Sequence, residues 1–300
     1  MPDFAIILCT FNPHKSFFKA QIESISKQNV KKFVYVFDDC SSHNSITFIK
    51  ETLTKYLKSE YKIIIREKNL GFAKNFISSI TKIHGYKFYA FCDQDDIWHS
   101  NRLDAAAKRL SKYDLYCSAS RLIDMNGNLL GVNRINQLPS FNHSLVQSIA
   151  GGNTYVFKEN VIDVMKKQID NIEIISHDWY MYQILSGCGF KIYYDSKPTI
   201  DYRIHKSNLV GREKTFWQNF VKLIAAFKGK LKYYNDCNIK ALSYYEPYFT
   251  SQNKKTFYHF VNDRNSSFFR RISLFTTHKL RRDSFLQNVV LLICCMIKKI

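Results

Sequence analysis

Short apolar runs alternate with longer amphipathic segments along the first 200 residues of the chain. The runs are FAIILCT, FVYVFD, YKIIIR and YKFYAFC, at residues 4–10, 33–38, 61–66 and 86–92. Each run is rich in β-branched or aromatic residues and is bounded by polar clusters, which is the pattern of a strand buried in a parallel sheet. The pattern therefore predicts four such strands.

The segments between these strands show helical spacing. Their apolar residues fall on one face, with Phe17, Phe18, Ile22 and Ile25 in residues 14–27 and Ile46, Ile49, Leu53 and Leu57 in residues 44–57. Strands that take turns with helices predict the α/β class, in which helices flank a mostly parallel, Rossmann-like sheet on both faces. Ligands of such sheets bind at the carboxyl ends of the strands, so we expect the chemistry of this chain there.

Polar loops follow all four predicted strands. They read Cys9-Thr10-Phe11-Asn12-Pro13, Asp38-Asp39-Cys40-Ser41-Ser42, Lys68-Asn69-Leu70-Gly71 and Asp93-Gln94-Asp95-Asp96. Each loop taken alone has an ordinary explanation, because Asn, Asp, Ser and Gly are common turn and N-cap residues. Four such loops at the same edge of a sheet favour a ligand site.

Asp93 and Asp95 stand two positions apart directly after the fourth strand, where their carboxylates can converge. Like charges held together cost free energy unless a cation lies between them. Carboxylate oxygens are hard ligands that suit Mg²⁺ or Mn²⁺, and such ions usually complete their shell with substrate phosphates. The spacing therefore predicts a divalent metal and a phosphorylated ligand.

Charge changes the picture for the last third of the chain. The formal net charge is +19, and residues 203–300 hold 19 Lys and Arg against 5 Asp and Glu. This imbalance indicates a functional boundary near residue 210, with a basic part that faces an anionic partner such as phospholipid or nucleic acid. We accordingly expect two domains, an α/β one at residues 1–212 and a helical, basic one at residues 213–300.

The pattern after residue 212 is helical, in segments such as TFWQNFVKLIAAFKGKLKYY and FLQNVVLLICCMI. These helices either pack against the first domain or attach to an anionic membrane face, to which each well-placed Lys or Arg contributes about 1 kcal/mol. The second segment is too short to span a bilayer, which takes about 20 apolar residues. The N-terminus, MPDFAIILCTF, lacks the basic start of a signal peptide, and the eight scattered cysteines fit reduced thiols. We therefore expect a cytoplasmic protein.

The order of these motifs resembles the family 2 glycosyltransferases of the GT-A fold, over residues 3–212. Within that family, the DQDDIW string at residues 93–98 is typical of a bacterial rhamnosyltransferase-like group that builds surface polysaccharides such as O-antigen and capsule. The resemblance implies an inverting, metal-dependent transfer from dTDP-rhamnose or a UDP-hexose. It also implies a saccharide or lipid-linked oligosaccharide acceptor and a location at the inner face of the cell membrane.

The resemblance also implies roles for the loop residues. The donor nucleotide would be bound by Thr10, Phe11, Asp39, Lys68, Asn69, Gly71, Asn75, Asp93 and Gln94. Asp39 would bond the base, Asp93 would lie near the ribose, and Asp95 would bind the Mn²⁺ or Mg²⁺ that bridges the diphosphate. One departure is His43, where the family often has Asp.

Three later motifs extend the implied site. Gly151 and Gly152 precede a strand-like run and form either a simple turn or a backbone that an acceptor can approach closely. Asp178 falls in the first turn of a predicted helix, where its negative charge can simply interact favourably with the helix dipole. The resemblance instead implies that Asp178 acts as general base and that Trp179 contacts the acceptor. In the ending Y-R-x-H-x-x-N-x-x-G of residues 202–211, Arg203 would contact the diphosphate and His205 the metal.

Two other functions remain open. A nucleotidyltransferase that makes the sugar nucleotide would share the sheet and the metal, but it should carry a glycine-rich basic loop after the first strand, and CTFNPHKS contains no glycine. A non-enzymatic protein that binds nucleic acid or membrane would explain the basic C-terminal part. Acidic loops at Asp38 and Asp93 would repel a phosphate backbone, so we expect no nucleic-acid partner.

Overall fold

The computed structural model of the protein describes residues 3–167, 172–205 and 227–300. The chain forms two compact units, each considered by itself below. The first, here called the sheet unit, takes the described parts of Met1–Arg134, Ala150–Gln168 and Lys191–Gly211. The second, the helical unit, takes those of Ile135–Ile149, Ile169–Phe190 and Arg212–Ile300. The domain boundary expected at residue 212 lies outside the described residues, as do Asn208 and Gly211 of the Y-R-x-H ending.

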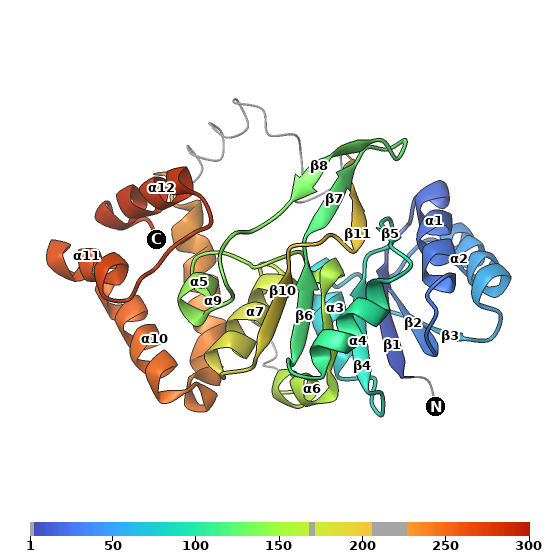
Figure 1. Ribbon diagram of the computed structural model, residues 1–300, viewed down its shortest axis with the longest axis horizontal. Helices are drawn as coiled ribbons and strands as arrows, with labels where there is room; N and C mark the ends of the chain where they lie inside the picture. Colours follow the sequence, from blue (N-terminus) through green and yellow to red (C-terminus); the bar gives the residue numbers. More distant parts are fainter. Residues whose placement is uncertain (1–2, 168–171, 206–226) are drawn as a thin grey trace. The chain divides into compact units, whose positions relative to one another are not determined.

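A mostly parallel sheet forms the centre of the sheet unit (Figure 1). Within the described residues its strand order is β10-β6-β9-β4-β1-β2-β3. The strands are β1 (Phe4–Thr10), β2 (Lys32–Asp38), β3 (Tyr61–Ile65), β4 (Phe88–Cys92), β6 (Leu115–Ser118), β9 (Val156–Lys158) and β10 (Ile192–Asp195). Pairs β1–β2, β1–β4, β2–β3 and β6–β10 are parallel, whereas β9 runs antiparallel to β4 and β6. The predicted α/β class with a mostly parallel sheet is confirmed.

Helices cover both faces of this sheet because the strands are apolar on both sides. On one face, Ile6 and Leu8 join a core cluster with Ile22 of α1 (Lys15–Ser26) and Ile49 of α2 (His43–Leu57). Helix α4 (Arg102–Leu110) adds Leu103 to the same cluster. On the other face, α3 (Phe72–Ile80) contacts β1 and β2, and α6 (Glu159–Met165) contacts α3 and β9. The four predicted strands and the two predicted helices are all present.

A second, smaller sheet was not foreseen from the sequence. Its order is β5-β11-β7-β8, from β5 (Ile97–Trp98), β11 (Ile200–Arg203), β7 (Ser120–Ile123) and β8 (Leu129–Asn133). Strand β11 pairs antiparallel with β5, so that Asp201 lies opposite Ile97. This pairing brings the residues that follow β11 next to the DQDD loop that precedes β5.

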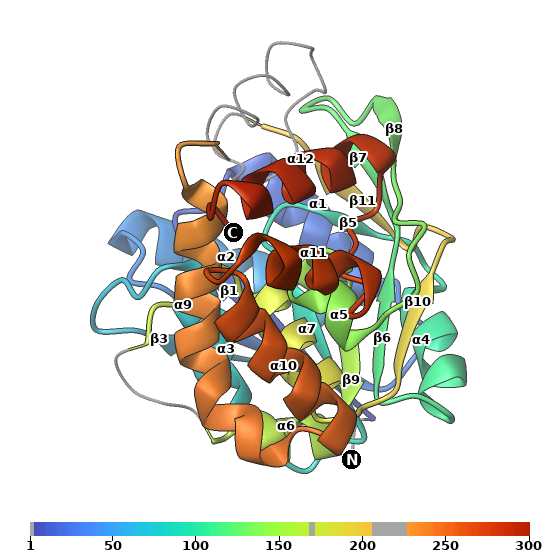
Figure 2. The ribbon, with the colours of Figure 1, turned by 90° about the vertical axis from the view of Figure 1, so that its left-hand side faces the viewer.

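The helical unit contains α5 (Phe141–Ser144), α7 (His177–Gly187), α9 (Lys230–Tyr245), α10 (Ser251–Asp263), α11 (Phe268–Thr276) and α12 (Phe285–Met296). Helix α7 contacts α5 and α9, α10 contacts α11, and α11 contacts α12 (Figure 2). The ring of Phe249 packs 5.0 Å from that of Phe141 and directly over Gly187, where a Cβ would lie 2.5 Å from the ring. The expectation of a helical C-terminal region is confirmed. None of the described helices combines the length and apolarity needed to cross a bilayer.

Candidate functional site

The carboxyl ends of β1 and β4 are joined by the side chain of Gln94. Its Oε1 accepts a hydrogen bond from the backbone N–H of Phe11 (2.9 Å), and its Nε2 donates to the Phe11 carbonyl (3.3 Å). These two hydrogen bonds fix the first loop against the DQDD loop, and Phe11 is 47% exposed. An exposed aromatic ring at this edge can stack on a planar ligand.

Asp38 is a buried carboxylate that organises the loop after β2. It accepts hydrogen bonds from the hydroxyls of Thr10 (2.9 Å) and Ser41 (2.6 Å) and from the Ser41 N–H (2.8 Å). The Thr10 hydroxyl, predicted to lie in the nucleotide pocket, thus makes a buried bond within the protein. The sequence reasoning gave Asp38 no role of its own, although its place directly before Asp39 is the signal that could have identified it.

Asp39 joins the loop after β2 to the loop after β3. Its two carboxylate oxygens accept from the backbone N–H groups of Leu70 (2.8 Å) and Gly71 (2.9 Å), and its carbonyl accepts from Asn69 Nδ2 (3.0 Å). Gly71 has φ of +78°, a left-handed value that favours glycine. Asp39, Asn69 and Gly71, which the family resemblance assigns to one nucleotide site, are therefore brought together.

Asn75 is buried below this loop. Its Nδ2 donates to the Phe37 carbonyl (2.9 Å), and its Oδ1 accepts from Arg66 Nε (3.1 Å). The Arg66 guanidinium also donates to the hydroxyls of Ser78 (2.8 Å) and Ser79 (3.0 Å), and burial lowers its pKa. Lys68 is exposed at the start of the loop. In this structure Asn75 holds α3 on β2, and sequence reasoning missed its partner Arg66.

Asp95 of the DQDD loop meets the segment that follows β11. Its Oδ2 lies 2.8 Å from Nε2 of His205, and Arg203 Nε donates to its carbonyl oxygen (3.1 Å). The Arg203 guanidinium lies 4.5 Å from the centre of the Phe17 ring, on which the His205 ring also stacks at 6.0 Å. The pair predicted as metal ligands and the residue predicted to contact the diphosphate therefore lie together.

Asp96 is the buried neighbour of this pair. One of its oxygens accepts from Asn153 Nδ2, and the other accepts from the backbone N–H of Arg203 (3.3 Å). Burial raises the pKa of Asp96 well above the usual range, and the nearby charges of Asp95 and Asp93 raise it further. Burial and the neighbouring carboxylates therefore favour the protonated, neutral form of Asp96. The sequence analysis gave Asp96 no role, although it is the third carboxylate of the string.

The Gly151-Gly152 turn is fixed to the same loop through Asn153. A Cβ at residue 151 would lie 2.6 Å from Asn153 Oδ1, which makes the absence of a side chain there a packing requirement. Gly152 begins a short 3-10 helix, Gly152–Thr154, and the Asn153 carbonyl accepts from the buried Arg102 (2.8 Å). The packing explains Gly151 without reference to a ligand, and its contact with the acceptor stays a prediction.

The donor set around Asp95 suits a divalent cation. It offers the Asp95 carboxylate and the His205 imidazole, whose side chains are 18% and 17% exposed, with Asp93 two positions before Asp95 in the same loop. Carboxylate oxygen with one imidazole nitrogen is a set that Mn²⁺ accepts readily, and Mg²⁺ accepts the carboxylate. The residues therefore fit the metal that the resemblance implies.

Asp178 and Trp179 belong to the helical unit. Helix α7 begins at His177, and the Asp178 carboxylate accepts from the backbone N–H of Trp179 (2.8 Å) in the first turn. The Trp179 indole donates to the Ser144 carbonyl (2.6 Å), which fixes the ring against α5. Burial lowers the pKa of His177 to about 3, so its imidazole is neutral. The first-turn position predicted for Asp178 is confirmed.

Comparison with known proteins decides the family. The profile described as glycosyl transferase family 2 matches residues 5–175, more than half of the chain. The chain belongs to glycosyl transferase family 2. It is 27% identical over 226 residues to the dTDP-rhamnosyl transferase RfbG of Shigella flexneri, covering 72% of this chain and 78% of that protein. It is 31% identical over 136 residues to the uncharacterized glycosyltransferase MJ1057 of Methanocaldococcus jannaschii, covering 43% and 45%.

Solved structures of glycosyltransferases share the fold. TarS of S. aureus in complex with UDP-GlcNAc matches with a TM-score of 0.57 at 13% identity, over 99% of this chain and 88% of that chain. The mannosyltransferase PcManGT of Pyrobaculum calidifontis, in complex with GDP-Man and Mn²⁺, matches with a TM-score of 0.53 at 12% identity, over 99% and 86%. This family 2 enzyme is therefore a glycosyltransferase with the GT-A fold.

Proposed function

We propose that this glycosyltransferase moves rhamnose, with inversion, from dTDP-rhamnose to a saccharide or lipid-linked oligosaccharide acceptor during surface polysaccharide synthesis. The observation that carries the proposal is the meeting of Asp95, His205 and Arg203 beside the Asp39 loop, at the carboxyl ends of the strands. The similarity to a dTDP-rhamnosyl transferase over 72% of the chain supports the choice of donor.

The donor nucleotide would lie along the edge formed by the first three loops. The exposed Phe11 ring offers an apolar surface for the base. Asp39 already accepts one backbone N–H on each oxygen, and each oxygen keeps a lone pair for a base N–H. Asp93, which follows β4, would take the ribose, and Lys68 adds positive charge at the entrance.

Asp95 and His205 would hold Mn²⁺ or Mg²⁺. When bound, the metal neutralises the negative charge that grows on the departing nucleoside diphosphate. Arg203 would add a fixed positive charge beside it, because guanidinium groups bind phosphate oxygens well. Arg203 also positions Asp95, since it donates to the backbone carbonyls of Asp95, Asp124 and Met125.

The transfer itself requires one base. An acceptor hydroxyl attacks the anomeric carbon and forms the new C–O bond, while the bond between that carbon and the diphosphate oxygen breaks and the diphosphate keeps the electron pair. The hydroxyl proton passes to the carboxylate of Asp178, as general base. Gly151, Gly152 and Trp179 would line the acceptor, whose rings can stack on the indole.

The helical unit would hold the enzyme at an anionic membrane surface in the cytoplasm. Phe269 at the start of α11 is 82% exposed, and Phe285 and Leu286 at the start of α12 are 85% and 67% exposed. Arg270 and Arg281 stand close to them in sequence, within the part of the chain that carries most of the net charge. Apolar side chains with adjacent basic ones favour the interface of an anionic bilayer.

A binding and turnover experiment tests the proposed function. Melting temperatures are measured with dTDP, UDP and GDP, each with and without Mn²⁺ or Mg²⁺, because a ligand that binds the native state raises Tm. Transfer from dTDP-rhamnose to a lipid-linked saccharide is then followed by release of dTDP. We expect a metal-dependent shift with dTDP and release of dTDP only when acceptor is present. A shift with UDP alone would overturn the choice of donor.

A further inference from the structure

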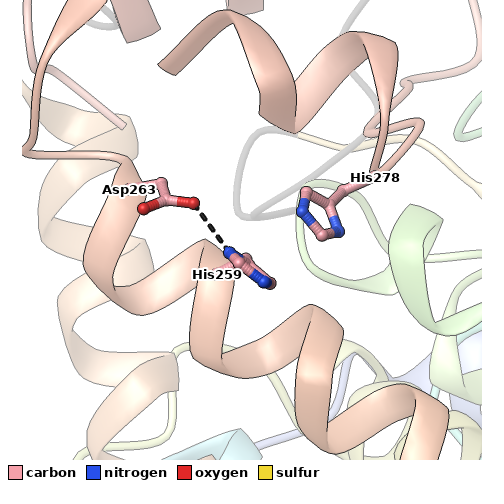
Figure 3. Close-up of side chains that lie close together, drawn as sticks. All are labelled: His259, Asp263 and His278. Atoms are coloured by element: carbon pink, nitrogen blue, oxygen red, sulfur yellow. Dashed lines mark hydrogen bonds and ion pairs between the residues drawn. The ribbon is translucent and has the colours of Figure 1, made fainter. Parts of the chain in front are cut away.

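A second group of metal-ligand side chains lies in the helical unit, in His259, Asp263 and His278 (Figure 3). Each offers one nitrogen or oxygen, and these atoms all lie within 4.8 Å of one another. Within residues 3–167, 172–205 and 227–300, no other three side chains of His, Cys, Asp or Glu meet this condition. The proposed transfer reaction does not use this cluster.

Helix α10 places two of the three side chains on one face. His259 and Asp263 are four residues apart, so they lie one above the other. His259 Nδ1 lies 2.9 Å from Asp263 Oδ2, and the Asp263 side chain is 8% exposed. A carboxylate this deeply buried requires a cationic or hydrogen-bonding partner, and His259 is the partner that the described contacts provide.

The third side chain is that of His278, which lies just after the end of helix α11. The N–H groups of Thr277 and His278 both donate to the Ser273 carbonyl (2.9 and 3.1 Å), and the His278 carbonyl accepts from Asn142 Nδ2 (2.5 Å). Lys279 then turns the chain with φ of +51°, a left-handed value that a residue with a side chain rarely adopts. The backbone of His278 is therefore held on both sides.

The two imidazole rings are stacked. Their centres lie 4.4 Å apart at an interplanar angle of 29°. Two imidazolium ions so close would repel each other. Neutral imidazoles are the form that binds metal ions. The cluster offers two imidazole nitrogens and one carboxylate, a donor set typical of zinc sites that keep an open position.

A cavity of about 450 Å³ opens beside the three side chains. It is large enough for water to supply the fourth ligand of a tetrahedral ion. Arg270 also borders it, and the surrounding helices are basic, so electrostatics oppose a cation at this place. An ion held there must gain strongly from imidazole coordination, which favours Zn²⁺ and related borderline ions over Mg²⁺ or Ca²⁺.

We propose that His259, Asp263 and His278 form a binding site for one borderline transition metal ion of the Zn²⁺ class. The ion joins α10 to the segment after α11 and keeps one position for water. Zinc bonds to nitrogen and oxygen are about 2.0–2.2 Å long, so the three ligand atoms must draw together by side-chain rotation from their present spacing. Binding also exchanges the hydrogen bond between His259 and Asp263 for two bonds to the metal.

Zinc binding to the purified full chain tests this site. The Asp95→Asn variant serves as the background, so that the site at Asp95 does not contribute. Equilibrium dialysis against Zn²⁺ alone gives the stoichiometry, and Co²⁺, whose visible absorption intensifies on tetrahedral coordination, reports the geometry. We expect one tightly bound ion per chain, and an affinity at least about 100-fold weaker after His278→Ala, since loss of a hydrogen-bond partner of a ligand alone costs 10–100-fold.

Two further variants make the outcome decisive. His259→Gln changes a partly exposed side chain and should weaken Zn²⁺ binding as much as His278→Ala does. The metal-free Tm of this variant should stay near that of the parent. His84→Ala changes an exposed histidine in the sheet unit and should leave binding intact. Stoichiometric binding that survives both His278→Ala and His259→Gln, or no bound Zn²⁺ in the parent, overturns the proposal.

Discussion

The carboxylate of Asp95 lies 2.8 Å from Nε2 of His205, although 110 positions separate the two residues in the sequence. The contact exists because β11 pairs with β5, which follows the DQDD loop directly. It joins two motifs that sequence analysis could associate only through a family resemblance. This carboxylate and imidazole are the pair proposed to hold the metal, and the predictions for the site begin from them.

Asp95→Asn should abolish metal-dependent binding of dTDP and leave the fold intact. The amide carries no charge and cannot balance the cation, whereas the bond from Arg203 goes to the backbone of residue 95 and survives. A ligand at 100 times its Kd stabilises the native state by about 2.7 kcal/mol, and this gain should vanish in thermal-shift measurements with Mn²⁺. The control variant Asp104→Asn, at an exposed carboxylate of α4, should keep this metal-dependent stabilisation. An unchanged metal-dependent shift in Asp95→Asn would remove Asp95 from the metal site.

Asp178→Asn should bind the donor normally and lose transfer. An amide cannot accept the proton of the acceptor hydroxyl, and general base catalysis contributes about 10²–10⁴-fold to a rate. The amide oxygen of Asn can still accept the hydrogen bond from the backbone N–H of Trp179, so α7 should still form. Single-turnover kinetics with saturating dTDP-rhamnose measure the effect, with the exposed Asp163→Asn as control. A rate within a few-fold of the parent would mean that another group takes the proton.

The site could be predicted as far as local patterns and sheet geometry reach. The strands and helices around Asp39 and Asp93 follow from periodicity, and parallel strands necessarily bring the loops at their carboxyl ends to one edge. Which atoms these carboxylates contact does not follow from the pattern. Asp39 accepts two backbone N–H groups, and Asp38 bonds Thr10, because turn geometry decides where each side chain points.

Pairings between distant residues were beyond prediction. Strands β5 and β11 have two and four residues, too few to show a period, and their register depends on tertiary contacts such as the ion pair of Arg121 with Asp201 (2.5 Å). The same holds for the bond between Asp96 and Asn153. The helical unit also gathers Ile135–Ile149 and Ile169–Phe190 with the C-terminal residues, a grouping that no composition change in those segments indicates.

Asp39→Asn should weaken both the fold and donor binding. The single amide oxygen of Asn can still accept a hydrogen bond from one of the backbone N–H groups of Leu70 and Gly71. The other N–H then faces the amide NH₂, a second donor, and its hydrogen bond is lost. Losing a hydrogen bond to a buried charged group costs roughly 1.5–3 kcal/mol, which urea titration should show as a lower free energy of unfolding. The KM for the donor should rise because the loop is no longer fixed. A rise in KM without loss of stability would indicate that Asp39 acts on the nucleotide alone.

The double variant Phe269→Glu/Phe285→Glu should release the enzyme from anionic vesicles. Burying one such ring is worth about 1.5–3 kcal/mol, so removing two and adding negative charge should weaken binding by well over tenfold. Cosedimentation with vesicles of phosphatidylglycerol and phosphatidylcholine measures it, and added salt should weaken the parent's binding. Leu129→Glu, at an exposed apolar residue of the sheet unit, is the matched control. Equal sedimentation of all three proteins would refute a membrane role for α11 and α12.

The buried imidazole of His143 should make the protein less stable in mild acid. Burial, opposed by Asp283 and aided by Arg282, lowers the pKa of His143 to about 4, below the usual value of 6.5. As the pH falls below 6.5, His143 therefore becomes protonated in the unfolded chain but stays neutral in the folded one. Stability is full above that pH and declines toward pH 4, with a loss of about 2 kcal/mol between pH 7 and pH 5.

His143→Asn should lower stability at pH 7 but remove this part of the pH dependence, because the amide does not titrate. Urea titrations of the parent, this variant and His84→Asn at both pH values measure the difference, and an equal decline in all three would show that His143 does not titrate as proposed.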